Sequence, residues 1–364
     1  MNSRTKHILV AVLLTALLGA NADGAGREKP SPEKEIQAPV FFPPAPGVPR
    51  LQYLSTYNGS NDIEKKRPSR FMKFVLGEEE RIEAIQKPYG AVLHNDKLFV
   101  CDTGKGVVWI FNLVDNTMVP MGHASPGRLR KPISIAIDDD GTRYVTDTAL
   151  RRLMVYDADN RYVKAYGDPE TFKPTDVLIQ GDTLYVCDVE QGIVSVLDKG
   201  TGDVIRTIGE KGSGPGQLFF PTNIALDTEG NLYVSDTGNA RVMKFDPEGV
   251  FIKQIGSLGM SVGRFTRPKG LALDKENRMY VADAAFDNVQ VFDDTGSLLL
   301  FFGGVGVQPG SMELPAGISI DYEHTKFFKD KVAPGHTLDY LILVTSQIGA
   351  HKVSVYGFLK EEGE

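Results

Sequence analysis

The sequence predicts an all-β fold, a six-bladed β-propeller of four-stranded antiparallel blades, and two observations lead to it. Six prolines recur every 42 to 47 residues, and each opens a short apolar run. A second apolar run, ending in aspartate, follows each of the first five prolines after 14 or 15 residues. A period in the forties composed of short strands is typical of a propeller. The prolines are Pro88, Pro132, Pro174, Pro221, Pro268 and Pro315.

The fourth repeat shows the four expected strands most clearly. They cover residues 223–227, 232–235, 241–245 and 250–255, and Gly, Asp, Asn and Pro occupy the intervening turns, where tight reversals favour them. The strands are rich in Val, Ile, Leu, Tyr and Phe, and no helical crossover separates them. We expect blades near residues 86–122, 131–167, 173–209, 219–256, 267–303 and 314–358.

The sixth repeat departs from the others. It has three expected strands, a polar insertion at about 322–338, Thr345 in place of the aspartate, and a charged tail at 359–364. A propeller must close its ring, because an open end exposes a sheet edge. Residues 50–58 form an unassigned strand before the first blade, and we predict that they supply the missing outer strand of blade six.

Residues 1–22 are expected to be a secretory signal peptide. Arg4 and Lys6 precede an apolar run, and Ala20-Asn21-Ala22 provides a small-x-small cleavage pattern. This predicts an exported protein, periplasmic or extracellular. Membrane attachment is expected only if this segment stays uncleaved as an anchor. Residues 23–49 read as a Pro-rich linker, and residues 59–85 as a connector with a possible short helix.

The charge and cysteine content exclude some classes of protein. The formal charge is −7, and loss of the first 22 residues would make it more negative, which disfavours a nucleic-acid binder. Two cysteines are too few for a disulfide-stapled secreted domain. Cys101 and Cys187 occupy the same position in repeats one and three. We therefore predict two free, buried thiols.

The fourth repeat, PTNIALDTEGNLYVSDTGNARVMKFDPEG, resembles the NHL repeat, and looser copies extend the resemblance over about residues 86–358. The resemblance implies a six-bladed propeller and leaves the activity open. NHL relatives include RNA-binding translational regulators, sensor domains of receptor kinases and a metal-dependent peptidylglycine amidating lyase. Calcium-dependent lactonases are more distant six-bladed propellers.

Several motifs that suggest chemistry have a structural interpretation. Aspartates that end the second strand of a blade can accept hydrogen bonds from turn N–H groups, and we assign them to structure: Asp102, Asp147, Asp188, Asp236 and Asp283. The glycine-rich segment 209–216 lacks the Lys-Ser or Lys-Thr of a phosphate-binding loop. The histidines lack metal-ligand spacing, although His123 and His351 could share one site. No catalytic residue and no metal ligand is assigned.

The most plausible binding surface is the face made by the loops between blades and by the turns between the second and third strands, here called the loop face. Basic residues gather there around the expected mouth of the central channel, and a focused positive rim can attract anions to an acidic protein. Asp176 and Asn223 form a polar pair at the same mouth. The candidate residues are Lys87, Lys131, Lys173, Arg267, Lys269, Arg151, Arg241, Asp176 and Asn223, with Arg128, Arg130 and Arg152 in neighbouring loops.

Two functions from different classes follow. The first is an exported, non-enzymatic binding or scaffold propeller that holds a protein or an anionic envelope component at the loop face. The alternative is a metal-dependent lactonase or lyase working at the channel mouth. No cofactor is assigned. Ca²⁺ at the channel mouth is retained as an alternative, because oxygen ligands at a channel can hold it.

Overall fold

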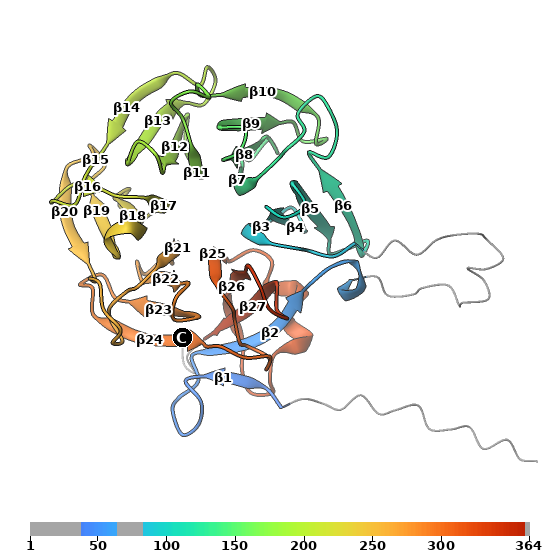
Figure 1. Ribbon diagram of the computed structural model, residues 1–364. Coiled ribbons are helices and arrows are strands. Elements are labelled where there is room, and N and C mark those ends of the chain that lie inside the picture. Colours follow the sequence, from blue (N-terminus) through green and yellow to red (C-terminus); the bar gives the residue numbers. More distant parts are fainter. Residues whose placement is uncertain (1–37, 64–82, 361–364) are drawn as a thin grey trace, which may run out of the picture. The chain divides into compact units, whose positions relative to one another are not determined.

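The structure, a computed structural model, describes residues 38–63 and 83–360. Six sheets surround a central axis, and the fold class is confirmed: five sheets have four antiparallel strands each, arranged like the blades of a propeller (Figure 1). The expected signal peptide, residues 23–37 of the linker, the connector helix and residues 361–364 of the tail lie outside the described residues. Among the described residues, no helix has the length and apolarity needed to span a membrane.

Each blade runs from an inner strand at the axis to an outer strand at the rim. Blade one contains β3 (Pro88–His94), β4 (Lys97–Asp102), β5 (Val107–Asn112) and β6 (Thr117–Met121). Blade two contains β7 (Pro132–Ile137), β8 (Arg143–Asp147), β9 (Arg152–Tyr156) and β10 (Tyr162–Tyr166). Blade three contains β11 (Pro174–Gln180), β12 (Thr183–Asp188), β13 (Ile193–Asp198) and β14 (Val204–Ile208).

The second half of the ring repeats this order. Blade four contains β17 (Pro221–Leu226), β18 (Leu232–Asp236), the 3₁₀ turn η2 (Thr237–Asn239), β19 (Arg241–Phe245) and β20 (Phe251–Ile255). Blade five contains β21 (Pro268–Leu273), β22 (Met279–Asp283), β23 (Asn288–Phe292) and β24 (Leu298–Gly303). A small parallel pair, β15 (Glu210–Lys211) and β16 (Gln217–Leu218), lies between blades three and four.

The N-terminal strand closes the ring, as predicted. Blade six contains β25 (Pro315–Asp321), β26 (Leu338–Ser346) and β27 (Val353–Leu359), and β2 (Leu51–Tyr57) pairs antiparallel with β27. One expectation is wrong: this sheet has five strands, because β1 (Val40–Phe42) adds to the far side of β2 (Figure 1). Residues 40–42 had been assigned to the linker, since three residues are too few to show an alternating pattern.

The prediction that Thr345 replaces the aspartate in blade six is also wrong. Each of the first five prolines faces its aspartate across the strand pair, but Pro315 faces Ser346 rather than Thr345. The β25–β26 register therefore makes Thr345 the equivalent of Thr146 in blade two. The contacts agree, since Gly317 N donates to Thr345 Oγ1 at 2.9 Å and Ser134 N donates to Thr146 Oγ1 at 3.0 Å.

The insertion of blade six braces the closing strand. It carries η3 (Thr325–Phe327) and η4 (Lys329–Lys331), while a further 3₁₀ turn, η1 (Ser60–Asp62), follows β2. Gln52 is buried and donates to Lys331 O at 2.8 Å, and its Oε1 accepts from Ala333 N at 3.0 Å. His324 Nε2 accepts from Asp96 N of blade one at 3.2 Å. The insertion thus ties both sides of the seam where the chain meets itself.

The core is divided among the blade boundaries. In the described residues, one apolar cluster fills each of the six boundaries between neighbouring blades. The prediction of two free, buried thiols is confirmed: Cys101 and Cys187 lie on different blades, and both are completely buried without a disulfide. Every blade therefore depends on both neighbours for its core, which makes ring closure essential to stability.

Candidate functional site

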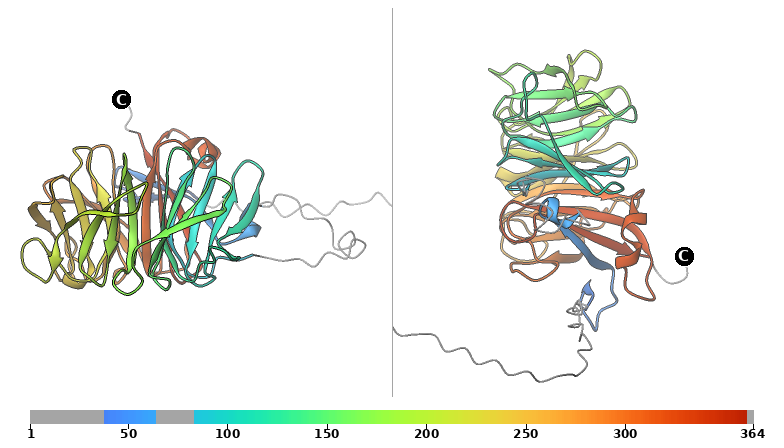
Figure 2. Two further views of the ribbon diagram at one scale, coloured as in Figure 1. Left: turned by 90° about the horizontal axis from the view of Figure 1, so that it is seen from above. Right: turned by 90° about the vertical axis from the view of Figure 1, so that its right-hand side faces the viewer.

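The loop face is a consequence of the strand order. All six inner strands begin at this face, so the loops between blades and the turns between second and third strands meet there, while the other turns lie on the opposite face (Figure 2). The central opening of the ring ends in this face. Residues next to the six prolines therefore converge on the axis although they are about 45 positions apart in the chain.

The five aspartates hold the loop face together. Each carboxylate is fully buried and accepts at least one N–H from the loop before its proline, and four of the five also accept a backbone N–H from their own turn, where Asp236 instead accepts from the Asn239 side chain. Asp102, for example, accepts from Lys87 N at 2.9 Å and from Gly104 N at 2.9 Å. The others accept from Lys131, Lys173, Phe219 and Arg267. Four of the predicted basic residues thus have their backbones fixed by a buried carboxylate.

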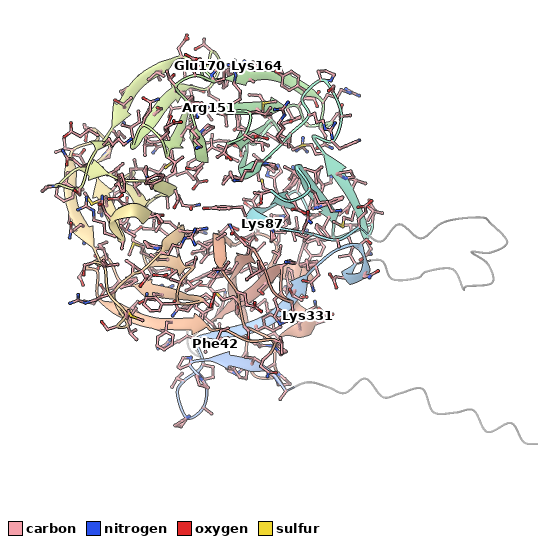
Figure 3. All side chains as sticks on the ribbon, viewed as in Figure 1. Phe42, Lys87, Arg151, Lys164, Glu170 and Lys331 are labelled. Atoms are coloured by element: carbon pink, nitrogen blue, oxygen red, sulfur yellow. The ribbon has the colours of Figure 1, made fainter. Side chains whose placement is uncertain are left out.

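Three of these basic side chains are exposed and unpaired. Lys87, Lys131 and Arg267 make no side-chain hydrogen bond or ion pair within residues 38–63 and 83–360. Figure 3 shows Lys87 beside the central opening. Lys173 is half-buried and lines a smaller hollow of about 170 Å³ with Glu190, Lys211 and Phe220.

Two predicted members of the rim are engaged in structure instead. Arg151 forms an ion pair with Glu190 at 2.6 Å and donates to Glu170 O at 3.2 Å, away from the opening (Figure 3). Arg241 is buried, with its Nε 2.9 Å from Asp236, and its Nη2 donates to two carbonyls of the segment 209–218. Both arginines brace loops, and the structure does not bring them to the channel mouth.

Lys269 and Tyr89 form the centre of the site. Lys269 is buried, and its Nζ lies 5.2 Å from the centroid of the Tyr89 ring. Burial, followed by the positive charges of Arg267, Lys87 and Lys131, lowers the pKa of Lys269 from 10.5 to about 8. Three cations from blades one, two and five therefore act on the Lys269 ammonium at the channel mouth.

Tyr89 was not among the site residues predicted from the sequence. It is buried on the inner strand of blade one, and its hydroxyl interacts with Thr222 on blade four, so the side chain crosses the opening between opposite blades. Tyr89 directly follows Pro88, the same position that Lys269 occupies after Pro268, but only the charged residue had been selected as a candidate. An aromatic residue at the first position was the signal that could have identified it.

Asp176 and Asn223 are brought together, as expected, at 3.3 Å between Asp176 Oδ2 and Asn223 Nδ2. Asp176 also accepts from Ile224 N and Val177 N, each at 2.9 Å. Burial raises the pKa of Asp176 to about 6, although these hydrogen bonds oppose the shift. The corresponding residues of blades one, five and six are glycines, and a Cβ on Gly317 would approach Tyr89 O to 2.2 Å. At the second position after the proline, polar side chains therefore come only from blades two to four.

The residues at the mouth do not fit a calcium ion. Ca²⁺ takes six to eight oxygen ligands. Both carboxylate oxygens of Asp176 already accept N–H groups, and in the described part of the chain no group of three or more His, Cys, Asp or Glu side chains could hold a metal. The four neighbouring cations also disfavour a metal ion. Asn223 Oδ1, which is buried without a hydrogen-bond partner, is one oxygen that remains free.

A basic cleft of about 670 Å³ extends the site between blades one and two. Lys105, Arg128 and Arg130 line it, together with His123, and these three cations form no side-chain ion pair within the described ranges. His351 lies elsewhere: its Nε2 is 3.2 Å from Val307 O, and no described contact joins it to His123. The two histidines do not form a shared site.

Comparisons with known proteins support the repeat assignment. The DUF5128 family model, described as a 6-bladed beta-propeller, matches residues 167–250. NHL repeat-containing protein 3 of Homo sapiens is 33% identical over 67 residues, 18% of this chain and 19% of its own length. Protein lin-41 of Caenorhabditis elegans is 46% identical over 48 residues, 13% of this chain and 4% of its own. The chain is an NHL-type six-bladed β-propeller. It matches less than a fifth of the length of either relative.

Solved structures share the fold of this NHL-type propeller at low identity. Virginiamycin B lyase from Staphylococcus aureus superposes with a TM-score of 0.52 at 14% identity, covering 74% of this chain and 80% of the lyase. A gluconolactonase from Xanthomonas campestris superposes with a TM-score of 0.55 at 15% identity, covering 76% of this chain and 87% of the lactonase. At this identity the likeness concerns the fold alone.

The raised pKa of Asp176 predicts a pH dependence of stability. The folded state binds the proton more tightly than the unfolded state, whose pKa is 3.8, so stability falls as pH rises through 6. We expect the unfolding free energy of the wild type, relative to an Asp176→Asn variant, to fall by about 2 kcal/mol between pH 4.5 and pH 7.5. Urea denaturation at both pH values measures this, and a constant difference would contradict the shift.

Proposed function

We propose that this NHL-type propeller is an exported, non-enzymatic binding or scaffold protein that captures an anionic ligand at the loop face. The ligand would be an acidic protein segment or an anionic envelope component. The observation that carries the proposal is Lys269, a buried ammonium with three further cations acting on it and no carboxylate in ion-pair contact among residues 38–63 and 83–360. Uncompensated charge of this kind is costly, and an anion bound at the mouth would relieve it.

The surroundings of Lys269 suit an anion. Lys87, Lys131 and Arg267 are exposed and free to reach a ligand, while their backbones are held by Asp102, Asp147 and Asp283. The cleft between blades one and two adds three more unpaired cations on the same face. Acidic residues exceed basic ones in the whole chain, so this focused positive region would select where an anion binds.

Charge reversal tests the proposal. We expect the double variant Lys131→Glu, Arg267→Glu to lower the affinity for an anionic ligand about tenfold or more, because each reversal replaces an attraction with a repulsion. The matched control is Lys97→Glu, Arg161→Glu, which reverses one lysine at the start of β4 and one arginine in a turn, both at the opposite face. Retention on immobilised polyphosphate and capture from an envelope extract are the measurements. Equal loss in both variants, or no loss in either, would refute the proposal.

The pKa of Lys269 provides an independent test. A bound anion favours the ammonium, so binding is strongest below pH 8 and weakens as Lys269 loses its proton above pH 8. We expect the affinity for inorganic polyphosphate to fall by up to about tenfold per pH unit above pH 8. In a Lys269→Arg variant, which stays charged, the decline should disappear. A decline that persists in this variant would show that another group controls binding.

The rival proposal is a metal-dependent lactonase or lyase. Its support is the lyase and lactonase among structures of the same fold, together with the Asp176 carboxyl beside the unpaired Asn223 Oδ1. Metal analysis of the purified protein separates the two proposals. Stoichiometric Ca²⁺ or Zn²⁺ that is lost in the Asp176→Ala variant would favour the enzyme over the binding protein.

A further inference from the structure

The loop face has an apolar half that the channel-mouth site does not use. Two successive loops, one between blades four and five and one between blades five and six, present aliphatic side chains to solvent. Their exposed fractions are 88% for Met260, 78% for Val305, 72% for Val307, 67% for Leu258 and 58% for Val262. Phe220, in the loop between blades three and four, is 53% exposed. Such a concentration of exposed apolar side chains marks an interaction surface.

These loops are held in shape rather than loosely collapsed. Phe265 is fully buried, and its carbonyl accepts from Gly259 N at 3.0 Å. Gln290 of blade five fixes the same loop, accepting from Gly263 N at 2.8 Å and donating to Arg264 O at 2.9 Å. In the next loop Met312 is buried, and its N donates to Gly304 O at 3.0 Å. One apolar residue of each loop thus anchors in the core while its neighbours project outward.

The loop that carries Met260 is positively charged, whereas the loop that carries Val305 and Val307 contains one acidic residue, Glu313. The loop at residues 257–267 contains Arg264 and Arg267 and no acidic residue. Around the same face lie Lys87, Lys105, Arg128, Arg130 and Lys131, without carboxylate partners among residues 38–63 and 83–360. Projecting aliphatic groups combined with lysine and arginine are complementary to the surface of an anionic lipid bilayer, whose headgroups attract the cations while the tips enter the acyl boundary.

The shape of this half also favours a bilayer over a protein partner. Protein interfaces depend on aromatic and arginine anchors that fit well-packed pockets. Here the most exposed side chains are Met, Val and Leu on separate loops that emerge from the same face of the ring. A planar surface contacts several such tips at once. We propose that the loop face docks on an anionic lipid bilayer, with Met260, Val305 and Val307 entering the headgroup–acyl boundary.

A site-specific probe tests this docking in the full chain. An environment-sensitive dye is attached to a Met260→Cys variant, and since Cys101 and Cys187 are buried, labelling is confined to the new thiol. We expect a blue shift of its emission with vesicles of phosphatidylglycerol and phosphatidylcholine and a much smaller shift with phosphatidylcholine alone. The control dye is attached to a Val114→Cys variant, 59% exposed in a turn on the opposite face. It should not respond to either vesicle.

Vesicle co-sedimentation completes the test. We expect the Met260→Asp, Val305→Asp double variant to lose at least about tenfold in affinity for the anionic vesicles, while Val114→Asp does not. No blue shift at position 260, or an equal shift at position 114, would overturn the proposal and leave a protein as the occupant of this face. The Lys269→Arg variant keeps the vesicle response if docking is correct, whatever the outcome for polyphosphate.

Discussion

A chain that lacks residues 39–58 should lose its cooperative thermal transition. These residues contain β1 and β2, and β2 buries Leu51, Leu54 and Tyr57 in the apolar clusters on both sides of blade six. Burial of one such side chain contributes about 1.5 to 3 kcal/mol, so three contribute on the order of 5 kcal/mol or more. Whole domains are stable by only about 5 to 15 kcal/mol. The deletion would also leave β27 as an open sheet edge.

A point variant measures the packing contribution of one side chain separately from the effect of deleting the whole segment. Leu51 is completely buried between blades five and six, and Leu51→Ala should lower the unfolding free energy by about 2 to 5 kcal/mol. Val48, three residues earlier and 72% exposed, is the matched control, and Val48→Ala should change stability by less than about 0.5 kcal/mol. Calorimetry measures both. A deletion variant that melts at the wild-type temperature would refute closure by the N-terminal strand.

The second large effect is expected at Asp102. Its carboxylate accepts N–H groups from Gln86, Lys87, Gly104 and Lys105, and from the Trp109 indole at 3.1 Å. Asp102→Ala would leave the buried Trp109 indole N–H and four partly buried backbone N–H groups without their acceptor. Because each unsatisfied buried donor costs about 1 to 3 kcal/mol, we expect a loss of about 3 kcal/mol or more.

The control for this variant is Asp115→Ala, an exposed turn aspartate on the opposite face that should change stability little. Thermal denaturation is measured in EDTA and in Ca²⁺. If Asp102 has a structural role, the Asp102→Ala variant loses the same amount of stability in both solutions. Stabilisation of the wild type by Ca²⁺ that disappears in Asp102→Ala would instead make this residue a metal ligand.

Much of the fold was accessible from the sequence because a propeller repeats one local pattern. Each proline begins an inner strand, and each Tyr-Val-x-Asp run ends the second strand, so regular spacing predicts six similar blades. The errors occur in blade six, where the pattern is interrupted. Thr345 and Ser346 are adjacent in the chain, and only the pairing register with β25 decides which one replaces the aspartate. Strand β1 has three residues and is defined by pairing with β2 rather than by its own composition.

The candidate site was only partly predictable. Lys87, Lys131, Arg267 and Lys269 were expected at one face, and the structure brings them close enough to affect the pKa of Lys269. Arg151 and Arg241 were expected beside them but bind Glu190 and Asp236. Whether an arginine is free or paired depends on side-chain partners that sequence spacing does not specify.

The sequence by itself determined the number of blades, the strand that closes the ring and the face on which the irregular loops gather, because these follow from local periodicity and chain direction. The tertiary structure alone decided that Tyr89 crosses the opening, that Lys269 is buried with three cations around it, and that aliphatic tips occupy the other half of the face. The reason is physical: burial and charge interaction depend on distances between residues from different blades, and those distances exist only once the ring is closed.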